Sequence, residues 1–191
     1  MRSLSAIVAE QYRAMPCLAG IEPAPKGPNH NAKLRGFKLL ANIVDYQFDQ
    51  VKRMVDVVWI QGDPYENADD MFADVFVNNR LQIFVGGTSA VLSPTVNLKL
   101  RAVHDYLAHY LPRNQFGLQG EARAFLAHVS TFKSLAGLPE HDQGLAAMAL
   151  ASEILGQTCC HDQGFGFPKQ KLNFLPWSLG QTLDIAKQLA K

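Results

Sequence analysis

Apolar residues recur every three or four positions along most of the chain, and this helical period is the feature that most restricts the fold. The period covers residues 4–15, 33–60, 97–111, 120–135, 143–157 and 178–189. A short helix is also expected from Asn67 or Ala68 to Phe76. Residues 81–85 are the best strand candidate, because β-branched and aromatic side chains end there at two glycines. The sequence therefore predicts a mostly α, single helical-bundle-like domain with at most a small β element.

Prolines and glycines are concentrated between residues 16 and 32, directly after the first predicted helix. Such a stretch is typical of a loop or linker, because proline removes a backbone donor and interrupts a helix. We therefore expect residues 1–32 to form an N-terminal helix followed by a Pro/Gly-rich arm. Residues 33–191 are expected to form one helical domain, since a chain of 191 residues suits a single domain.

The charge composition narrows the classes of partner. Lys and Arg number 18 and Asp and Glu 17, so the formal net charge is +1. Nucleic-acid binding through a basic helix at residues 33–53 is therefore the third choice of function. The sequence shows no apolar run of ~18 residues and no secretory signal pattern, so neither a membrane span nor secretion is expected. Three cysteines, two of them adjacent, fit a reducing compartment.

Five of the six histidines fall within residues 104–161, and the predicted helices there also carry acidic residues. At ~100° per residue, Asp105 and His109 lie one turn apart on a helix face that His104 adjoins. The next two helices carry similar polar pairs on one stripe, Glu121 with His128 and Glu153 with Gln157. Imidazole is the commonest protein metal ligand, so three such helices in succession indicate a shared site.

Helical bundles build metal sites from polar side chains on facing helices. The ligands expected here, for one or two ions, are His104, Asp105, His109, Glu121, His128 and Glu153. Mixed nitrogen and oxygen donors suit Zn, Mn or Fe. The residues expected to take part in a reaction are Glu121, His104 and Glu153. A metal-dependent hydrolase acting on a phosphoester or an amide is preferred to an oxygenase, and whether the chain is an enzyme stays open.

Each polar pair also has an ordinary explanation. Asp105 and His109 would form a surface pair worth ~0.2–0.5 kcal/mol, and Glu121 would be an acid favoured in the first turn of its helix. Together they could form a buried hydrogen-bond network that fixes how the helices pack. The low charge content and the aromatic residues between 165 and 177 would then suit a non-enzymatic subunit of a homo-oligomer.

Four sequence blocks follow one another in a recognisable order over residues 63–160. One block joins Arg-Ala-Val-His-Asp at 101–105 to His109. A later block joins Gly120-Glu121 to His128, and the last contains Glu153 and Gln157. This order resembles a family of phage and mobile-element domains, associated with polyvalent proteins, that carry RAVHDxxGH, GE…A…H and ET.GQ motifs. The family tends to have Gly at 108 and Thr at 154, where this chain has Ala and Ile.

The resemblance implies a phage-encoded protein in the host cytoplasm or the virion. Its partners would be copies of itself or phage virion proteins. The resemblance implies no activity. The non-enzymatic alternative therefore becomes a virion, structural or host-factor-binding protein.

Overall fold

The computed structural model describes residues 2–16, 30–86, 92–135 and 137–191. The elements in these ranges are α1 (Leu4–Ala14), α2 (His30–Met54), β1 (Asp56–Ile60), α3 (Ala68–Asn78), β2 (Arg80–Phe84), α4 (Pro94–His104), η1 (Asp105–Tyr110), α5 (Leu118–Phe132), α6 (Glu140–Ala151), η2 (Ser152–Gly156), α7 (Gln157–Asp162) and α8 (Leu179–Leu189). The labels η1 and η2 mark two π-helical turns that continue α4 and α6. The predicted mostly α fold with a small β element is confirmed.

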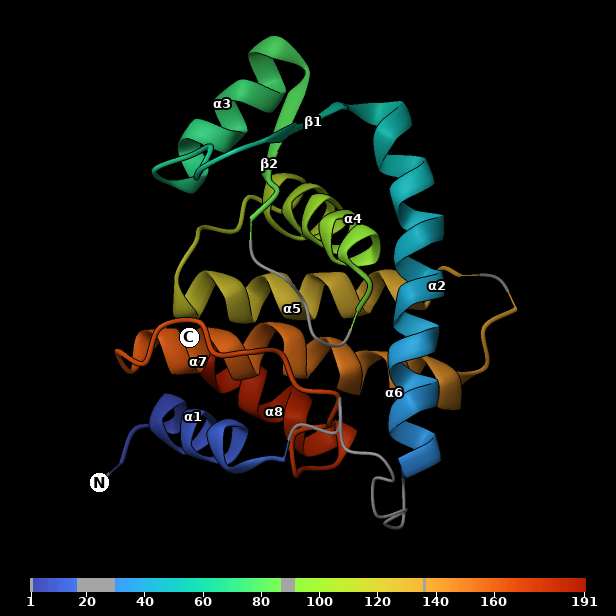
Figure 1. The fold of residues 1–191 in the computed structure, drawn as a ribbon, viewed down its shortest axis with the longest axis vertical. Helices are drawn as coiled ribbons and strands as arrows, with labels where there is room; N and C mark the ends of the chain where they lie inside the picture. The colour runs from blue at the N-terminus through green and yellow to red at the C-terminus, as the bar shows by residue number, and fades with distance from the viewer. Residues whose placement is uncertain (1, 17–29, 87–91, 136) are drawn as a thin grey trace.

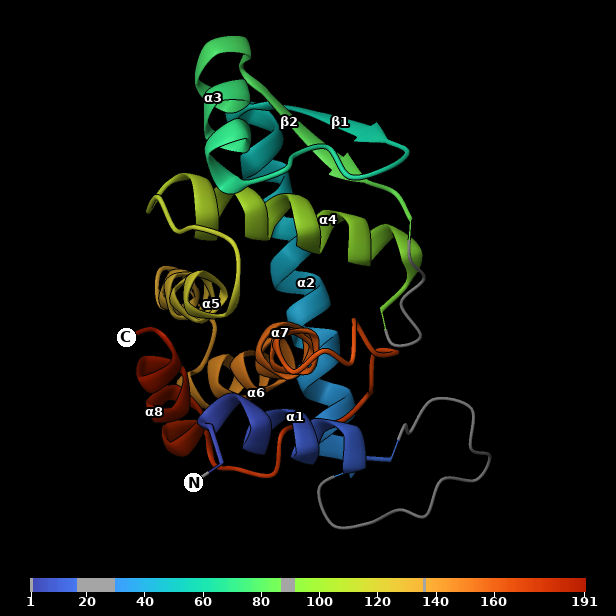
Figure 2. The same cartoon turned by 90° about the vertical axis from the view of Figure 1, so that its left-hand side faces the viewer.

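The longest helix, α2, runs along most of the length of the molecule, and the other helices are arranged in layers across it (Figure 1). Helices α4 and α6 both contact α2, while α8 packs on α5. The strands β1 and β2 lie with α3 at one end, and α1 lies at the other (Figures 1 and 2). Figure 2 shows α5 and α7 end-on, side by side beneath α4. The three motif-bearing segments are therefore neighbours in space.

Two groups of buried hydrophobic side chains hold the layers together. The larger group includes Val8 and Tyr12 of α1, Leu40 of α2 and Phe125 of α5, all fully buried. The smaller group joins the end of α2 to α3, β2 and α4. Helix α1 thus belongs to the main core, whereas most of the predicted Pro/Gly-rich arm lies outside the described residues.

The predicted helix over residues 33–60 is wrong at its end, because α2 stops at Met54 and residues 56–60 form β1. The β-branched and aromatic side chains of Val57, Val58 and Trp59 favour a strand, and β1 pairs in parallel with β2 from Asp56–Arg80 to Ile60–Phe84. The predicted end of the third motif helix at residue 157 is also wrong, since α7 continues to Asp162.

One buried carboxylate holds this small α/β unit in register. Asp74 of α3 accepts hydrogen bonds from four side chains, which are Tyr65, Asn78, Arg80 and Gln82. The Tyr65 hydroxyl in turn accepts a bond from the backbone N–H of Gln82, at 2.8 Å. These contacts join α3 to β2 and to the loop after β1, which borders the cavity described below.

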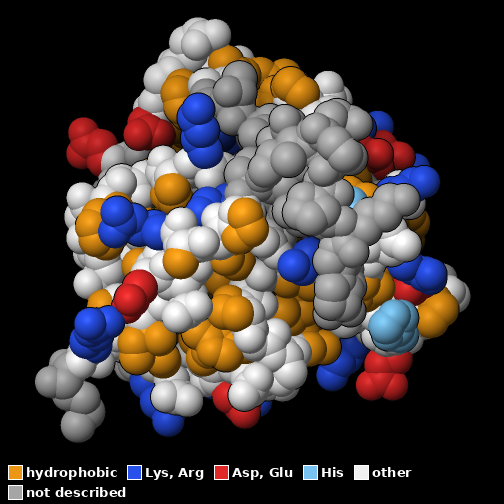
Figure 3. Space-filling view, turned by 60° about the horizontal axis from the view of Figure 1, so that its bottom comes forward, with side chains coloured by type: hydrophobic (Ala, Val, Ile, Leu, Met, Phe, Trp, Pro, Cys, Tyr) orange, Lys and Arg blue, Asp and Glu red, His pale blue; other side chains and the backbone are white. Residues whose placement is uncertain are grey.

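The described surface mixes apolar and charged side chains. Figure 3, which brings the bottom of Figure 1 forward, shows hydrophobic side chains in clusters between scattered Lys, Arg, Asp and Glu. Among the described residues, no helix combines the length and the apolar character that a membrane crossing requires.

Candidate metal centre

The π-helical turn η1 decides which side chains meet. His104 and His109 are five residues apart, a spacing that would place them ~140° apart around a regular α-helix. In η1 the hydrogen bonds span five residues, as in the bond from the Leu111 N–H to the Tyr106 carbonyl at 3.0 Å. This wider turn brings both imidazoles to one side, where their Nε2 atoms are 3.0 Å apart. The π-helical turn thus pairs His104 with His109, and Asp105, expected on the same face as His109, acts on that imidazole through its charge.

Glu121 of α5 completes a triangle of donor atoms. Its Oε2 atom lies 3.1 Å from His104 Nε2, and its Oε1 atom lies 3.3 Å from His109 Nε2. The His109 side chain is 1% exposed, that of His104 12% and that of Glu121 21%. Two imidazole nitrogens and one carboxylate thus converge on one point near the protein interior, and the three residues could hold a metal ion.

The local backbone explains why Glu121 reaches this point. Gly120 lies in the first turn of α5, and a Cβ atom there would collide with the backbone carbonyl of Gln115. Only glycine lets the preceding loop approach the helix so closely. The neighbouring Glu121 is thereby held against η1, so the Gly120-Glu121 pair of the sequence motif has a steric basis.

The same loop fixes the proton on His109. Its Nδ1 atom lies 3.1 Å from the backbone carbonyl oxygen of Asn114, which can only accept a hydrogen bond. Nδ1 therefore carries the hydrogen, and in the neutral ring Nε2 is a bare acceptor. That acceptor points at a Glu121 carboxylate oxygen, which is an acceptor too. The arrangement calls for a positive charge between them, supplied either by a proton or by a cation.

The electrostatics of the triangle follow from this contact. Burial alone would lower the pKa of His109, but the Glu121 carboxylate raises it above its ordinary value. Burial alone would raise the pKa of Glu121, but hydrogen bonds from His104 and His109 hold it well below its usual range. Without a metal, the triangle therefore holds an ionised carboxylate next to an imidazole that gains a proton easily.

A cavity of about 950 Å³ opens onto the triangle, and its lining includes His104, Asp105 and Glu121. Glu153 and Gln157, from η2 and the start of α7, line the same cavity. Phe84, Phe116 and Phe167 add apolar surface. Ligand sites are commonly such concave, partly apolar spaces with a few convergent polar groups.

Glu153 is a strongly perturbed acid in this cavity. Its side chain is 7% exposed, and its Oε1 atom is buried without a hydrogen-bond partner among the described residues. Its Oε2 atom accepts one long bond of 3.4 Å from Gln157, so the predicted pairing of these two residues is confirmed. Burial raises the pKa of Glu153 to about 8, so this carboxyl is mostly protonated at neutral pH.

His128 lies behind the triangle and is not part of it. Its ring centroid is 5.8 Å from that of His104, and its Nε2 atom lies 3.0 Å from Gln47 Oε1 of α2. The side chain is fully buried, which lowers the pKa of His128 to about 3. His128 is therefore a neutral imidazole whose Nε2 atom faces Gln47.

The six predicted ligands thus separate into three groups. His104, His109 and Glu121 meet, Asp105 and Glu153 line the adjoining cavity, and His128 stands behind His104. Sequence reasoning missed Gln47 and the Asn114 carbonyl. Gln47 had a signal, because it is a polar residue on the apolar face of its helix, three positions after Val44. A backbone carbonyl has no signal in the sequence.

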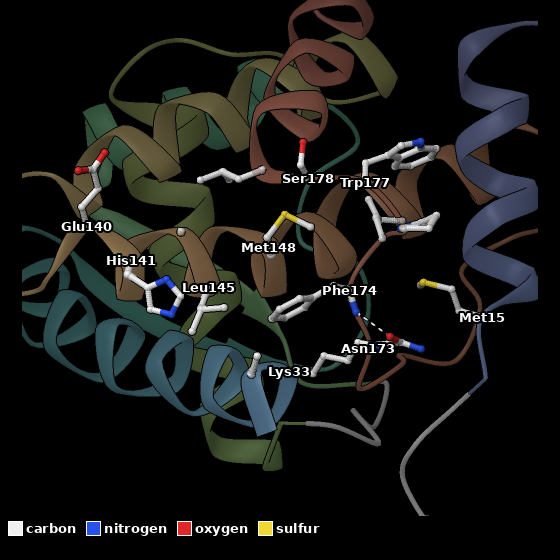
Figure 4. A pocket seen from close by; sticks show the side chains of 15 residues that line it. Met15, Lys33, Glu140, His141, Leu145, Met148, Asn173, Phe174, Trp177 and Ser178 are labelled. Atoms are coloured by element: carbon white, nitrogen blue, oxygen red, sulfur yellow. Dashed lines mark hydrogen bonds between the residues drawn. The ribbon is translucent and has the colours of Figure 1, made fainter. Parts of the chain in front are cut away.

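A second cavity, of about 890 Å³, lies elsewhere between α6, the start of α2 and the segment before α8 (Figure 4). Met148 and Phe174 occupy its middle, while Glu140 and His141 lie at the opposite end from Trp177 (Figure 4). Glu140 and His141 are exposed, in contrast to the buried triangle of the first cavity. The histidine cluster therefore marks the first cavity as the candidate site.

Comparison of the chain with models of known protein families, with curated proteins and with solved structures finds no match.

Proposed function

We propose that this chain is a metal-dependent hydrolase that holds one divalent ion, Zn, Mn or Fe, through His104, His109 and Glu121. One observation carries the proposal, which is the convergence of donor atoms in the triangle. Because the Asn114 carbonyl holds the proton on His109 Nδ1, the free lone pair of Nε2 points toward a carboxylate. A divalent cation satisfies all three donors at once, which a single proton does not.

The distances within the triangle fit such an ion. Donors about 2.0–2.1 Å from a metal lie roughly 2.9–3.4 Å from one another at octahedral or tetrahedral angles. The two imidazole nitrogens are 3.0 Å apart, His104 Nε2 lies 3.1 Å from Oε2 of Glu121, and His109 Nε2 lies 3.3 Å from Oε1, so this match requires both carboxylate oxygens to face the ion. Two histidines and one carboxylate leave coordination positions open for water or substrate, as catalytic sites require.

The surrounding residues supply the other parts of a hydrolytic site. A metal ion there would lower the pKa of a bound water and polarise a substrate oxygen. Glu153, with a pKa of about 8, can give and take a proton near neutral pH. We assign it the role of general acid and base. Glu153 lies on the cavity wall contributed by η2 and α7, while the triangle is contributed by α4, η1 and α5.

The charge of the cavity favours an uncharged or cationic substrate. Among the described residues its lining contains one arginine, Arg101, which donates to the backbone carbonyls of Phe84 and Gly86. Five carboxylic acids line the same space, namely Asp63, Asp105, Glu121, Glu153 and Asp162. Burial raises the pKa of Asp105 and Glu153, so the negative charge of the lining comes from the other three. A phosphoester dianion would be repelled by this lining. Of the two substrates expected from the sequence, we therefore propose the amide over the phosphoester.

The proposal is tested with purified chain and a panel of neutral amide, neutral ester and phosphoester substrates, assayed with Zn²⁺, Mn²⁺ or Fe²⁺. Glu153→Gln should retain the metal and lose about 100-fold or more of the turnover of an amide or ester. Glu140→Gln is the matched control, because Glu140 is an exposed acid at the start of α6. Equal turnover by Glu153→Gln and the natural chain would contradict the role of Glu153. Turnover of the phosphoester alone would contradict the substrate class.

The alternative is that the triangle is only a hydrogen-bond network in a non-enzymatic phage subunit. In that case the chain should bind none of the three metals, and a protonated His109 should form an ion pair with Glu121.

A further inference from the structure

A chain of hydrogen bonds from α2 to α5 determines the proton position on His128. The Thr131 hydroxyl donates to the backbone carbonyl of His128 at 2.6 Å, so its oxygen accepts from Gln47 Nε2 at 2.7 Å. This contact fixes the orientation of the Gln47 amide, whose Oε1 atom then faces His128 Nε2 at 3.0 Å. Nε2 of His128 must therefore donate. In a neutral imidazole, Nδ1 is then the bare acceptor.

His104 has the complementary requirement. If its Nε2 atom binds a metal ion, the hydrogen of the neutral ring sits on Nδ1, which becomes a donor. Nδ1 of His104 and Nδ1 of His128 are both buried, and neither has a hydrogen-bond partner among the residues described. Their rings are neighbours, with centroids 5.8 Å apart and planes inclined by 36°. A buried donor and a buried acceptor without partners thus lie in adjacent rings.

We propose that His128, held by Gln47 and Thr131, is a positioning residue of the metal site, whose Nδ1 atom accepts the Nδ1–H of His104 through one bridging water. The inference rests on the proposed metal site and deepens it. A polar separation beyond direct hydrogen-bond reach is commonly bridged by water, and buried waters serve otherwise unsatisfied groups. The contact would hold His104 in the tautomer that presents the Nε2 lone pair to the ion.

The two metal-binding imidazoles would then be oriented by different means. His109 donates its Nδ1–H to the backbone carbonyl of Asn114, whereas His104 would rely on the His128 side chain of α5, which Gln47 of α2 holds in place. Metal-binding histidines generally donate their second N–H to such a partner, and loss of that partner weakens metal binding by about 10–100-fold. His104 is therefore the ligand whose orientation a substitution of the neighbouring His128 can disturb.

The test measures zinc affinity by competition with a chromophoric chelator, using the full chain. His128→Phe keeps a buried ring and removes the acceptor, so zinc should bind about 10–100-fold more weakly. His128→Asn places an amide oxygen near the position of Nδ1 and should restore most of the affinity. Phe132→Leu is the matched control, because Phe132 packs against His128, with ring centroids 5.6 Å apart, and offers no polar atom. Its zinc affinity should equal that of the natural chain.

A second measurement needs no variant. Nitrogen NMR of the zinc-loaded natural chain should show His104 protonated at Nδ1 and His128 protonated at Nε2 only. Protonation of His128 at Nδ1, or equal zinc affinity in a folded His128→Phe chain, would overturn the inference and leave the proposed metal site intact. A natural chain that binds no zinc would refute both.

Discussion

The buried acid on the cavity wall makes a quantitative prediction about stability and pH. The pKa of Glu153 is about 8 in the folded chain and has its ordinary value of 4.5 in the unfolded chain. Between these two values the folded chain keeps a proton that the unfolded chain has released. The free energy of unfolding therefore falls as pH rises through this window. Each pH unit costs about 1.4 kcal/mol, so the loss from pH 4.5 to pH 8 is about 4 kcal/mol.

Glu153→Gln removes this ionisation while keeping a polar side chain beside Gln157. Urea unfolding of both chains, with a chelator present, should show the variant gaining about 4 kcal/mol relative to the natural chain between pH 4.5 and pH 8. Glu140→Gln should run parallel to the natural chain across the same range. A constant difference between the Glu153→Gln chain and the natural chain would show that Glu153 ionises normally, and the argument from its burial would fail.

Three further predictions concern other parts of the fold. Gly156→Ala would drive a Cβ atom into the Tyr12 ring of α1 and should lower the free energy of unfolding by about 1–3 kcal/mol, measured by urea unfolding. The folded chain holds His128 neutral with a pKa of about 3, against 6.5 ordinarily, so lowering the pH from 6.5 to 3 should remove about 4 kcal/mol of metal-free stability. The His128→Phe chain should lose less over the same pH range. Asp74→Ala would leave four side-chain donors without their acceptor and should cost about 2–4 kcal/mol, again by urea unfolding. An Asp74→Ala chain as stable as the natural one would refute the structural role of this carboxylate.

The helical period and the turn residues predicted most of the fold, because long amphipathic segments carry a strong signal. The prediction of a helix over residues 56–60 was wrong because a short apolar run fits the end of a helix as well as a strand. The strand assignment depends on a partner, β2, which is about 20 residues away in the sequence.

The candidate site was predicted in its residue types and only partly in its geometry. The histidines and acids stood out in the sequence, but the face they share depends on π-helical turns, and a spacing of five residues would not place side chains together on a regular α-helix. His128 was grouped with the ligands because it lies on the same helix as Glu121. Its partner Gln47 is far away in the sequence, so only the hydrogen bond between α2 and α5 shows that the Nε2 atom of His128 faces Gln47 and not the triangle.

The most direct test of the metal site is elemental analysis by mass spectrometry of the chain purified without chelator or affinity metal. The same analysis is made of Glu121→Gln, which keeps the shape of the side chain and removes its charge, and of Glu140→Gln as the control. The metal site predicts about one equivalent of Zn, Mn or Fe in the natural chain and the control, and its loss in Glu121→Gln. A natural chain that holds no metal, and takes up none of the three when each is supplied, would contradict the site.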